Sequence, residues 1–324
     1  NNIESSKKIN QSIKLDEVSY KNKIVDTISN HLVSLGFHEI ITNSLISAKN
    51  NTLNNDSENH LDVDILNFSS VDQAQLRNSM IFSGLNVINY NINRKRSNLK
   101  LFEVGKEFHK KNDNKYLELE KLAIFICGNR NNINWNSNEK RSDFFYLKGV
   151  VKSLTEKIGF KNVKSKPITK NNIREGETIS FNKSEIASFG LIEKNLCQNF
   201  DIEIDVLYAE FDLKTILNKY SNKPIQFKTI SKFPEVNRDL SILIDDELKF
   251  EKIHKSIKQI NQKLIKEITL FDVYDGKNLP KNKKSYGISF KIQNDEKTLS
   301  DNEIEEIMNN VIDKLKKEFN IELR

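Results

Sequence analysis

The side chains with the clearest chemical potential lie in the last hundred residues and comprise two hydroxyls, a carboxylate and an aromatic ring: Ser241, Asp272, Tyr274 and Ser285. An exposed ring can stack on an unpaired nucleobase, and a carboxylate can accept hydrogen bonds from the N1 and N2 hydrogens of a purine. Three nearby lysines could hold phosphates: Lys281, Lys283 and Lys284. Together these residue types are suited to binding single-stranded nucleic acid.

Three segments of alternating polar and apolar residues must position these side chains: 237–244, 265–274 and 285–292. Apolar residues at helical spacing follow the first strand, from Phe250 to Ile260. Ser300 and Glu303 have the form of a capping box and open a second helix, and residues 320–324 end the region as a short strand. The predicted order is β-α-β-β-α-β, a ferredoxin-like fold with two helices on one face of a four-stranded antiparallel sheet.

Alternation along the strands assigns their residues to two faces. The face under the helices is predicted to carry Leu240, Ile242, Ile244, Phe271, Val273, Tyr286, Ile288, Phe290 and Ile292. The other face, called the open face below, is predicted to carry Asp239, Ser241, Asp272, Tyr274, Ser285, Gly287, Ser289 and Lys291, edged by the three lysines of the adjoining loop. This pattern by itself favours a merely solvated face, with Tyr274 packing across the strands.

Residues 1–225 are predicted to form a separate α+β domain, joined to residues 226–324 by the polar segment Asn218–Lys223 and Pro224. A helix is expected from Val18 to Leu35 and ends before Gly36. Two more helices are expected over 75–93 and 143–158. Strands are expected over 37–42, 99–104, 122–127, 178–181, 186–192 and 207–213.

Catalytic motifs are missing from the sequence. It contains no Gly-rich phosphate loop and no Gly-x-Ser-x-Gly, and its five histidines share no metal-ligand spacing. Cys127 and Cys197 lie far apart and outside any zinc pattern. We therefore predict neither a catalytic site nor a metal site in this chain.

Composition narrows the class of protein. The 324 residues, 37% hydrophobic and 30% charged, suit two or three folded domains, and the net charge of +6 does not by itself imply nucleic acid. Two cysteines suit a reducing compartment, and no apolar run approaches about 18 residues, so we expect a cytoplasmic protein with no membrane partner. The chain starts without Met, and we expect it to be part of a longer polypeptide.

Several motifs resemble the ferredoxin-fold anticodon-binding domain of the phenylalanyl-tRNA synthetase β-chain family: residues 233–240, 270–276, 283–285, 297–301 and Leu323-Arg324. Upstream segments resemble the synthetase-like core domain of the same family: residues 35–44, 75–80, 101–105 and 143–150. The resemblance implies an antiparallel-sheet class II synthetase-like core without a working site, followed by the ferredoxin-like domain, in the C-terminal part of the β chain.

That resemblance also implies partners and roles. The first anticodon base of tRNA-Phe would be bounded by Ser241, Asp272 and Ser285, and a base would stack on Tyr274. The partner would be an α subunit in an α2β2 heterotetramer, whose α chains attach phenylalanine using ATP and Mg2+, with no cofactor held by this chain. Editing, magnesium-associated and N-terminal tRNA-binding domains would precede Asn1.

Two other functions remain open from the residues alone. A free-standing ACT-like module that binds a small regulatory molecule has the same β-α-β-β-α-β order. The loop after its first strand typically contains glycine, whereas Asp245-Asp246-Glu247-Leu248 has none. The other possibility is independent catalysis in the core domain, which the missing Phe-Arg-x-Glu pattern argues against.

Overall fold

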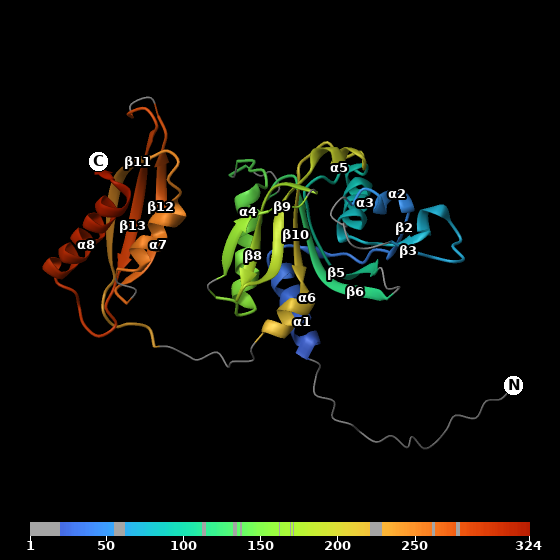
Figure 1. The fold of residues 1–324 in the computed structure, drawn as a ribbon, viewed down its shortest axis with the longest axis horizontal. Coiled ribbons are helices and arrows are strands. Elements are labelled where there is room, and N and C mark those ends of the chain that lie inside the picture. The colour runs from blue at the N-terminus through green and yellow to red at the C-terminus, as the bar shows by residue number, and fades with distance from the viewer. Residues whose placement is uncertain are drawn as a thin grey trace, which may run out of the picture. The chain divides into compact units, whose positions relative to one another are not determined.

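The computed structural model describes residues 20–54, 62–111, 115–131, 135–136, 138–161, 163–168, 170, 172–220, 229–260, 263–276 and 279–324. The chain divides into two compact units, Asn1–Lys223 and Pro224–Arg324 (Figure 1). The domain boundary predicted at 225/226 lies outside the described residues.

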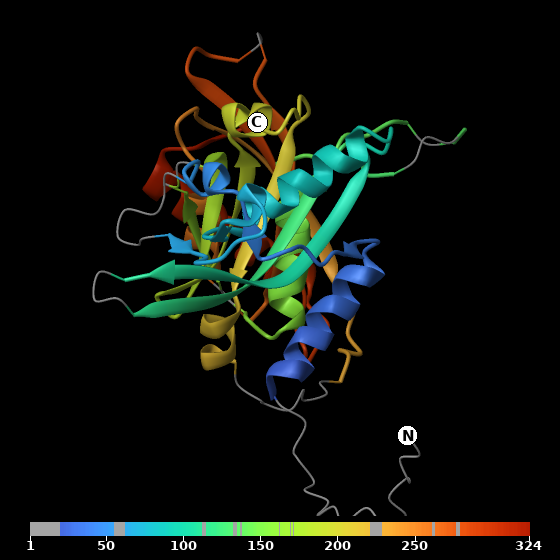
Figure 2. The same cartoon turned by 90° about the vertical axis from the view of Figure 1, so that its right-hand side faces the viewer.

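A seven-stranded sheet forms the centre of the first unit. In spatial order its strands are β1 (His38–Glu39), β5 (Leu99–Lys110), β6 (Tyr116–Cys127), β10 (Val206–Asp212), β9 (Ser184–Ile192), β8 (Ile173–Phe181) and β7 (Lys164–Pro167). Only the β1–β5 pair is parallel. Figure 2 shows the long β5–β6 hairpin with its two strands side by side.

Helices cover both faces of this sheet. One face packs against α1 (Tyr20–Ser34), α4 (Phe144–Lys157) and α6 (Leu213–Lys219), and the other packs against α3 (Met80–Ile92) and α5 (Lys194–Gln198). Strand β6 shows the division, because Leu122, Ile124 and Ile126 join the first core while Ala123, Phe125 and Cys127 join the second. A separate small sheet consists of β2 (Leu45–Ile46), β4 (Gln75–Leu76) and β3 (Val63–Asp64), next to the short helices α2 (Ala48–Asn51) and η1 (Val71–Gln73), and Ile46 joins the core on the α3 side.

Local signals account for several boundaries. Gly36 follows α1 with a φ of +83°, a left-handed conformation that glycine adopts without strain. Asp143 caps α4 by accepting a hydrogen bond from the Tyr146 N–H. The helix predicted over 75–93 is too long at its start, because residues 75–76 pair as β4 and Ser79 caps α3 instead.

The second unit has the predicted topology. Its elements are β11 (Val236–Asp245), α7 (Phe250–Lys258), β12 (Ile265–Tyr274), β13 (Lys283–Ile292), α8 (Asp301–Phe319) and β14 (Glu322–Leu323). The sheet order is β12-β13-β11-β14, and every pair is antiparallel. Ser300 and Glu303 form the expected capping box at α8. Both helices contribute to a single core beneath the sheet, around Ile288 and Phe290.

One prediction about this sheet is wrong. Leu270 pairs with Ile288 and Asp272 with Gly287, so Phe271 is an extra residue on β12, a β-bulge. Phe271 is 58% exposed and Val273 is 54% exposed, whereas both were expected under the helices. The residues of β12 that pack on the core are Ile265, Ile268 and Leu270.

Candidate nucleic-acid interface

The register of β11, β12 and β13 brings the predicted site residues to one face. Tyr274 pairs with Ser285, Asp272 pairs with Gly287, and Gly287 pairs on its other side with Ser241. Directly paired residues share a face, so these positions are neighbours on the open face. The hydroxyl oxygens of Ser241 and Ser285 lie 3.5 Å apart.

These side chains differ in how much solvent reaches them. Asp272 is exposed and Tyr274 is half-buried. Ser285 is only 3% exposed, so a base could reach its hydroxyl only if neighbouring side chains moved. The carboxylate and the ring are therefore the parts of the open face that are most ready for contact.

The bulge places Phe271 on the open face as well. An ideal Cβ built on Gly287 would lie 2.9 Å from Cζ of Phe271 and 3.0 Å from Cβ of Asp272. The Phe271 ring therefore lies over Gly287, which leaves room for it by having no side chain. The open face thus offers an exposed ring beside the Asp272 carboxylate, a combination suited to stacking and edge recognition of a base.

Arg324 is a second residue that the strand pattern did not single out. Its backbone N–H donates to the Ser241 carbonyl at 3.1 Å. Its guanidinium carbon lies 5.1 Å from the centre of the Tyr274 ring, a cation–π contact. A charged planar group thus lies beside the ring that was expected to stack.

The three lysines differ in position and partners. Lys281 is exposed in the β12–β13 connection, while Lys283 and Lys284 belong to β13 rather than to a loop. Lys283 forms an ion pair with Glu322. Lys284 pairs with Asp246 and lies over the Tyr286 ring, on the helix-covered face. The expectation that all three lysines edge the open face is therefore not met, because alternation puts Lys284 on the opposite side from Ser285.

Lys291 lies further along the open face. It faces Glu267 at 3.3 Å and Glu235 at 3.6 Å. The hydrogen bond with Glu267 and the charge of Glu235 raise the pKa of Lys291. Its charge is therefore already balanced by two carboxylates, which leaves Lys281 and Lys283 as the described lysines of this region better able to meet a phosphate.

Two family models match the chain in succession. The model of the phenylalanyl-tRNA synthetase beta chain CLM domain matches residues 6–213, and that of the ferredoxin-fold anticodon-binding domain matches residues 231–324. The chain belongs to the phenylalanyl-tRNA synthetase β-chain family. The predicted fold class, a class II synthetase-like α+β domain followed by a ferredoxin-like domain, is confirmed for this member of the family.

Individual relatives agree with this family. The phenylalanine–tRNA ligase beta subunit of Bacteroides thetaiotaomicron is 35% identical over 100% of this chain and 41% of its own length. That of Porphyromonas gingivalis is 32% identical over 95% of this chain and 39% of its own. The chain therefore spans about two fifths of the length of these relatives.

A solved pyrrolysyl-tRNA synthetase from Desulfitobacterium hafniense resembles the chain with a TM-score of 0.48 and 12% identity, covering 61% of this chain and 68% of the other. Within the described residues, no helix has the length and apolar character needed to cross a membrane.

Proposed function

We propose that this chain acts as a non-catalytic part of a phenylalanine–tRNA ligase β chain, in the cytoplasm and within an α2β2 enzyme. Its α partner would attach phenylalanine to tRNA-Phe with ATP and Mg2+. The family match over both units supports this proposal. It also argues against a free-standing ACT-like module, because residues 231–324 match an anticodon-binding family instead.

Within that enzyme, the open face would read the anticodon of tRNA-Phe. The observation that carries this role is the register that puts Asp272, Tyr274, Ser241 and Ser285 on one face, with Phe271 beside them. Asp272 would accept hydrogen bonds from the first anticodon base, and the rings would stack on bases. Lys281 and Lys283 would face phosphates.

A substitution at Asp272 tests the role in the enzyme reconstituted with its α chain. Asp272→Ala should weaken tRNA-Phe binding by about 1–3 kcal/mol, the usual worth of a base-edge contact. The same substitution should have little effect on a tRNA whose first anticodon base has been changed. Asp239→Ala removes another exposed carboxylate from the same face, opposite Ser289, and is the matched control.

Equal weakening for both tRNAs would show that Asp272 does not read the base. Charging activity by this chain without α would contradict the non-catalytic role.

A further inference from the structure

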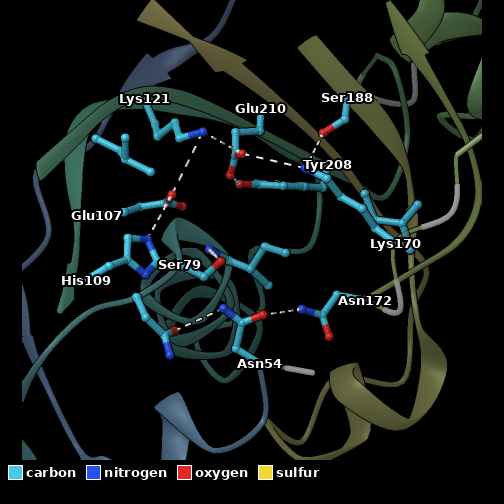
Figure 3. A pocket seen from close by; sticks show the side chains of 14 residues that line it. Asn54, Ser79, Glu107, His109, Lys121, Lys170, Asn172, Ser188, Tyr208 and Glu210 are labelled. Atoms are coloured by element: carbon cyan, nitrogen blue, oxygen red, sulfur yellow. Dashed lines mark hydrogen bonds and ion pairs between the residues drawn. The ribbon is translucent and has the colours of Figure 1, made fainter. Parts of the chain in front are cut away.

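A cavity of about 230 Å3 lies within the first unit, on the α3 side of its seven-stranded sheet. Figure 3 shows its walls, to which β5, β6, β9, β10 and the first turn of α3 all contribute. Four charged side chains line it: Glu107, Lys121, Lys170 and Glu210. Space of this size holds roughly eight waters, or one small organic molecule.

The sheet register gathers two of these charges from distant parts of the sequence. Lys121 on β6 pairs with Asp212 on β10, two residues along the strand from Glu210 and on the same face. The Lys121 ammonium lies 3.3 Å from Glu210 and 3.6 Å from Asp212. Burial opposes the charge on Lys121, but Glu210, Glu107 and Asp212 together raise its pKa. Lys121 is therefore a permanent cation held mainly by β10.

Lys170 also contacts polar side chains of the cavity wall. Its ammonium donates to the Ser188 hydroxyl at 3.0 Å and lies 3.9 Å from Glu210. Burial disfavours the Glu210 carboxylate, but Lys121, Lys170 and the hydrogen bond donated by Tyr208 lower the pKa of Glu210 to about 2. Glu210 is thus an anion with close donors on two sides.

Glu107 has no comparably close cation. Its Oε1 accepts the Met80 N–H at 3.1 Å, at the start of α3. Its Oε2 lies 4.0 Å from the Lys121 ammonium and 4.0 Å from Nε2 of His109, both longer than a hydrogen bond. The side chain is only 7% exposed. Burial and the nearby Glu210 raise the pKa of Glu107 by more than His109, Lys121 and the Met80 N–H lower it, so this carboxylate would gain from an added positive charge.

The charged groups around the cavity also include more carboxylates than lysine ammonium groups. A smaller hollow of about 140 Å3 shares Lys121, Lys170, Ser188 and Glu210 with the cavity and adds Glu185 and Asp212. Four carboxylates and two lysine ammoniums thus line the two hollows, with His109 as the remaining titratable group of the cavity beside Glu107. Across the part of the chain that the structure describes, no group of three His, Cys, Asp or Glu side chains could hold a metal. The missing positive charge is therefore better supplied by an organic cation.

We propose that this cavity binds a small molecule with a protonated primary amine, whose ammonium donates to Oε2 of Glu107. The other walls suit the remainder of such a ligand. Ile81, Leu119 and Ile173 offer apolar surface for a short chain, and Asn172 and Ser79 offer polar groups. Since a cavity of about 150 Å3 accommodates benzene, this one would admit roughly nine non-hydrogen atoms.

Binding should be measured on the 324-residue chain with n-butylammonium as the probe. Saturation-transfer NMR and thermal melting would each give a dissociation constant, because a ligand that binds only the folded state raises the melting temperature. Butan-1-ol has the same length without the charge, and butanoate has the opposite charge. We expect butylammonium to bind at least about tenfold more tightly than either, as a charge-assisted hydrogen bond requires.

Two variants locate the binding. Glu107→Gln keeps an acceptor for the Met80 N–H but removes the charge, and it should weaken butylammonium binding at least about tenfold. Glu118→Gln removes an exposed carboxylate of the same hairpin, paired with Lys106, and should change nothing. Leu119→Phe fills the cavity, keeps every charge and should also abolish binding.

Three results would overturn the proposal. They are no saturation transfer at about 50 mM butylammonium, equal binding of butan-1-ol, and unchanged binding in Glu107→Gln or Leu119→Phe. Any of these would mean that the charged cluster is an internal ion network occupied by solvent.

Discussion

Adding a single methyl group at Gly287 would test the geometry of the open face without deleting any of its side chains. The new Cβ would stand 2.9 Å from the tip of the Phe271 ring and 3.0 Å from Cβ of Asp272. Carbon atoms normally meet at about 3.5–4.0 Å, so both neighbours would have to retreat by roughly 0.5–1 Å. Gly287→Ala should therefore displace the bulge from its present position over β13.

The cost to stability should be small. Phe271 is 58% exposed, so the ring has little packing to lose when it moves, about 1 kcal/mol at most. Replacing a glycine within a strand returns about 0.5–1 kcal/mol, because alanine loses less backbone freedom on folding. These terms offset one another, and we expect the stability of the second unit to change by less than about 1 kcal/mol.

The cost to recognition should be larger. A hydrogen bond weakens steeply when its donor–acceptor distance grows by about 1 Å, and the Asp272 carboxylate would move with its Cβ. Losing a base-edge contact costs about 1–3 kcal/mol, so tRNA-Phe should bind the reconstituted enzyme roughly tenfold or more weakly. Gly287→Ala would then separate binding from folding.

Hydrogen exchange of peptides covering β13 would measure the local stability, and titration with labelled tRNA-Phe would measure the binding. Ser289→Ala changes the next open-face residue on the same strand and serves as the control. The reasoning fails if Gly287→Ala binds tRNA-Phe as the wild type does. It fails equally if β13 loses more than about 2 kcal/mol of protection, because the substitution would then have disrupted the fold.

Three further predictions follow from named contacts. Glu103→Ala should destabilise the first unit by about 3–5 kcal/mol, because it removes the carboxylate that lies 3.1 Å from the buried Arg77 guanidinium. A loss below about 1 kcal/mol in chemical denaturation would contradict this. Lys283→Ala should reduce the slope of log tRNA affinity against log salt concentration by up to about 0.9. Lys284→Ala should leave that slope unchanged, because Lys284 lies on the helix-covered face. Equal effects of the two substitutions would refute this distinction. Glu107→Gln should stabilise the first unit at neutral pH, because the raised pKa of Glu107 means that its ionised form lowers stability in the wild type. The gain should vanish in thermal melts below about pH 4.5, where the wild-type carboxyl is protonated in both the folded and the unfolded state. A gain that does not depend on pH would refute this prediction.

Sequence patterns predict the second unit well because its elements are regular and follow one another closely. The alternation of β11 and β13 and the Ser300 capping box are local signals, and the structure confirms the strands and the cap. The alternating pattern does not reveal the bulge at Phe271. One extra residue changes which face of the sheet the side chains before it occupy relative to the side chains after it. Two adjacent apolar residues, Leu270 and Phe271, allow either register, and the absence of a side chain at Gly287 is the only hint of where the ring goes.

The cavity of the first unit could not be predicted in the same way. Glu107 and Glu210 lie about a hundred residues apart in the sequence, and the chain has 45 acidic residues in which such pairs carry no signal. What joins them is the sheet order β5-β6-β10-β9, which places β10 beside β6 although five named elements separate them in the chain. Long-range pairing of this kind is fixed by packing across the whole sheet and leaves no local trace.

The charges on these central strands call for an explanation that stability alone does not supply. A buried ion network is often no more stable than an apolar core of the same volume, and Glu107 lies no nearer than 4.0 Å to Lys121 or to His109 within its network. Residues that lower stability are expected where they serve binding, since a site must leave some of its groups unsatisfied until the ligand arrives. The Glu107→Gln variant tests both the effect of this carboxylate on stability and its role in binding butylammonium. If it gains stability without ligand and loses butylammonium binding, the carboxylate is maintained for a ligand; if it gains stability and binding is unchanged, the ligand explanation is wrong.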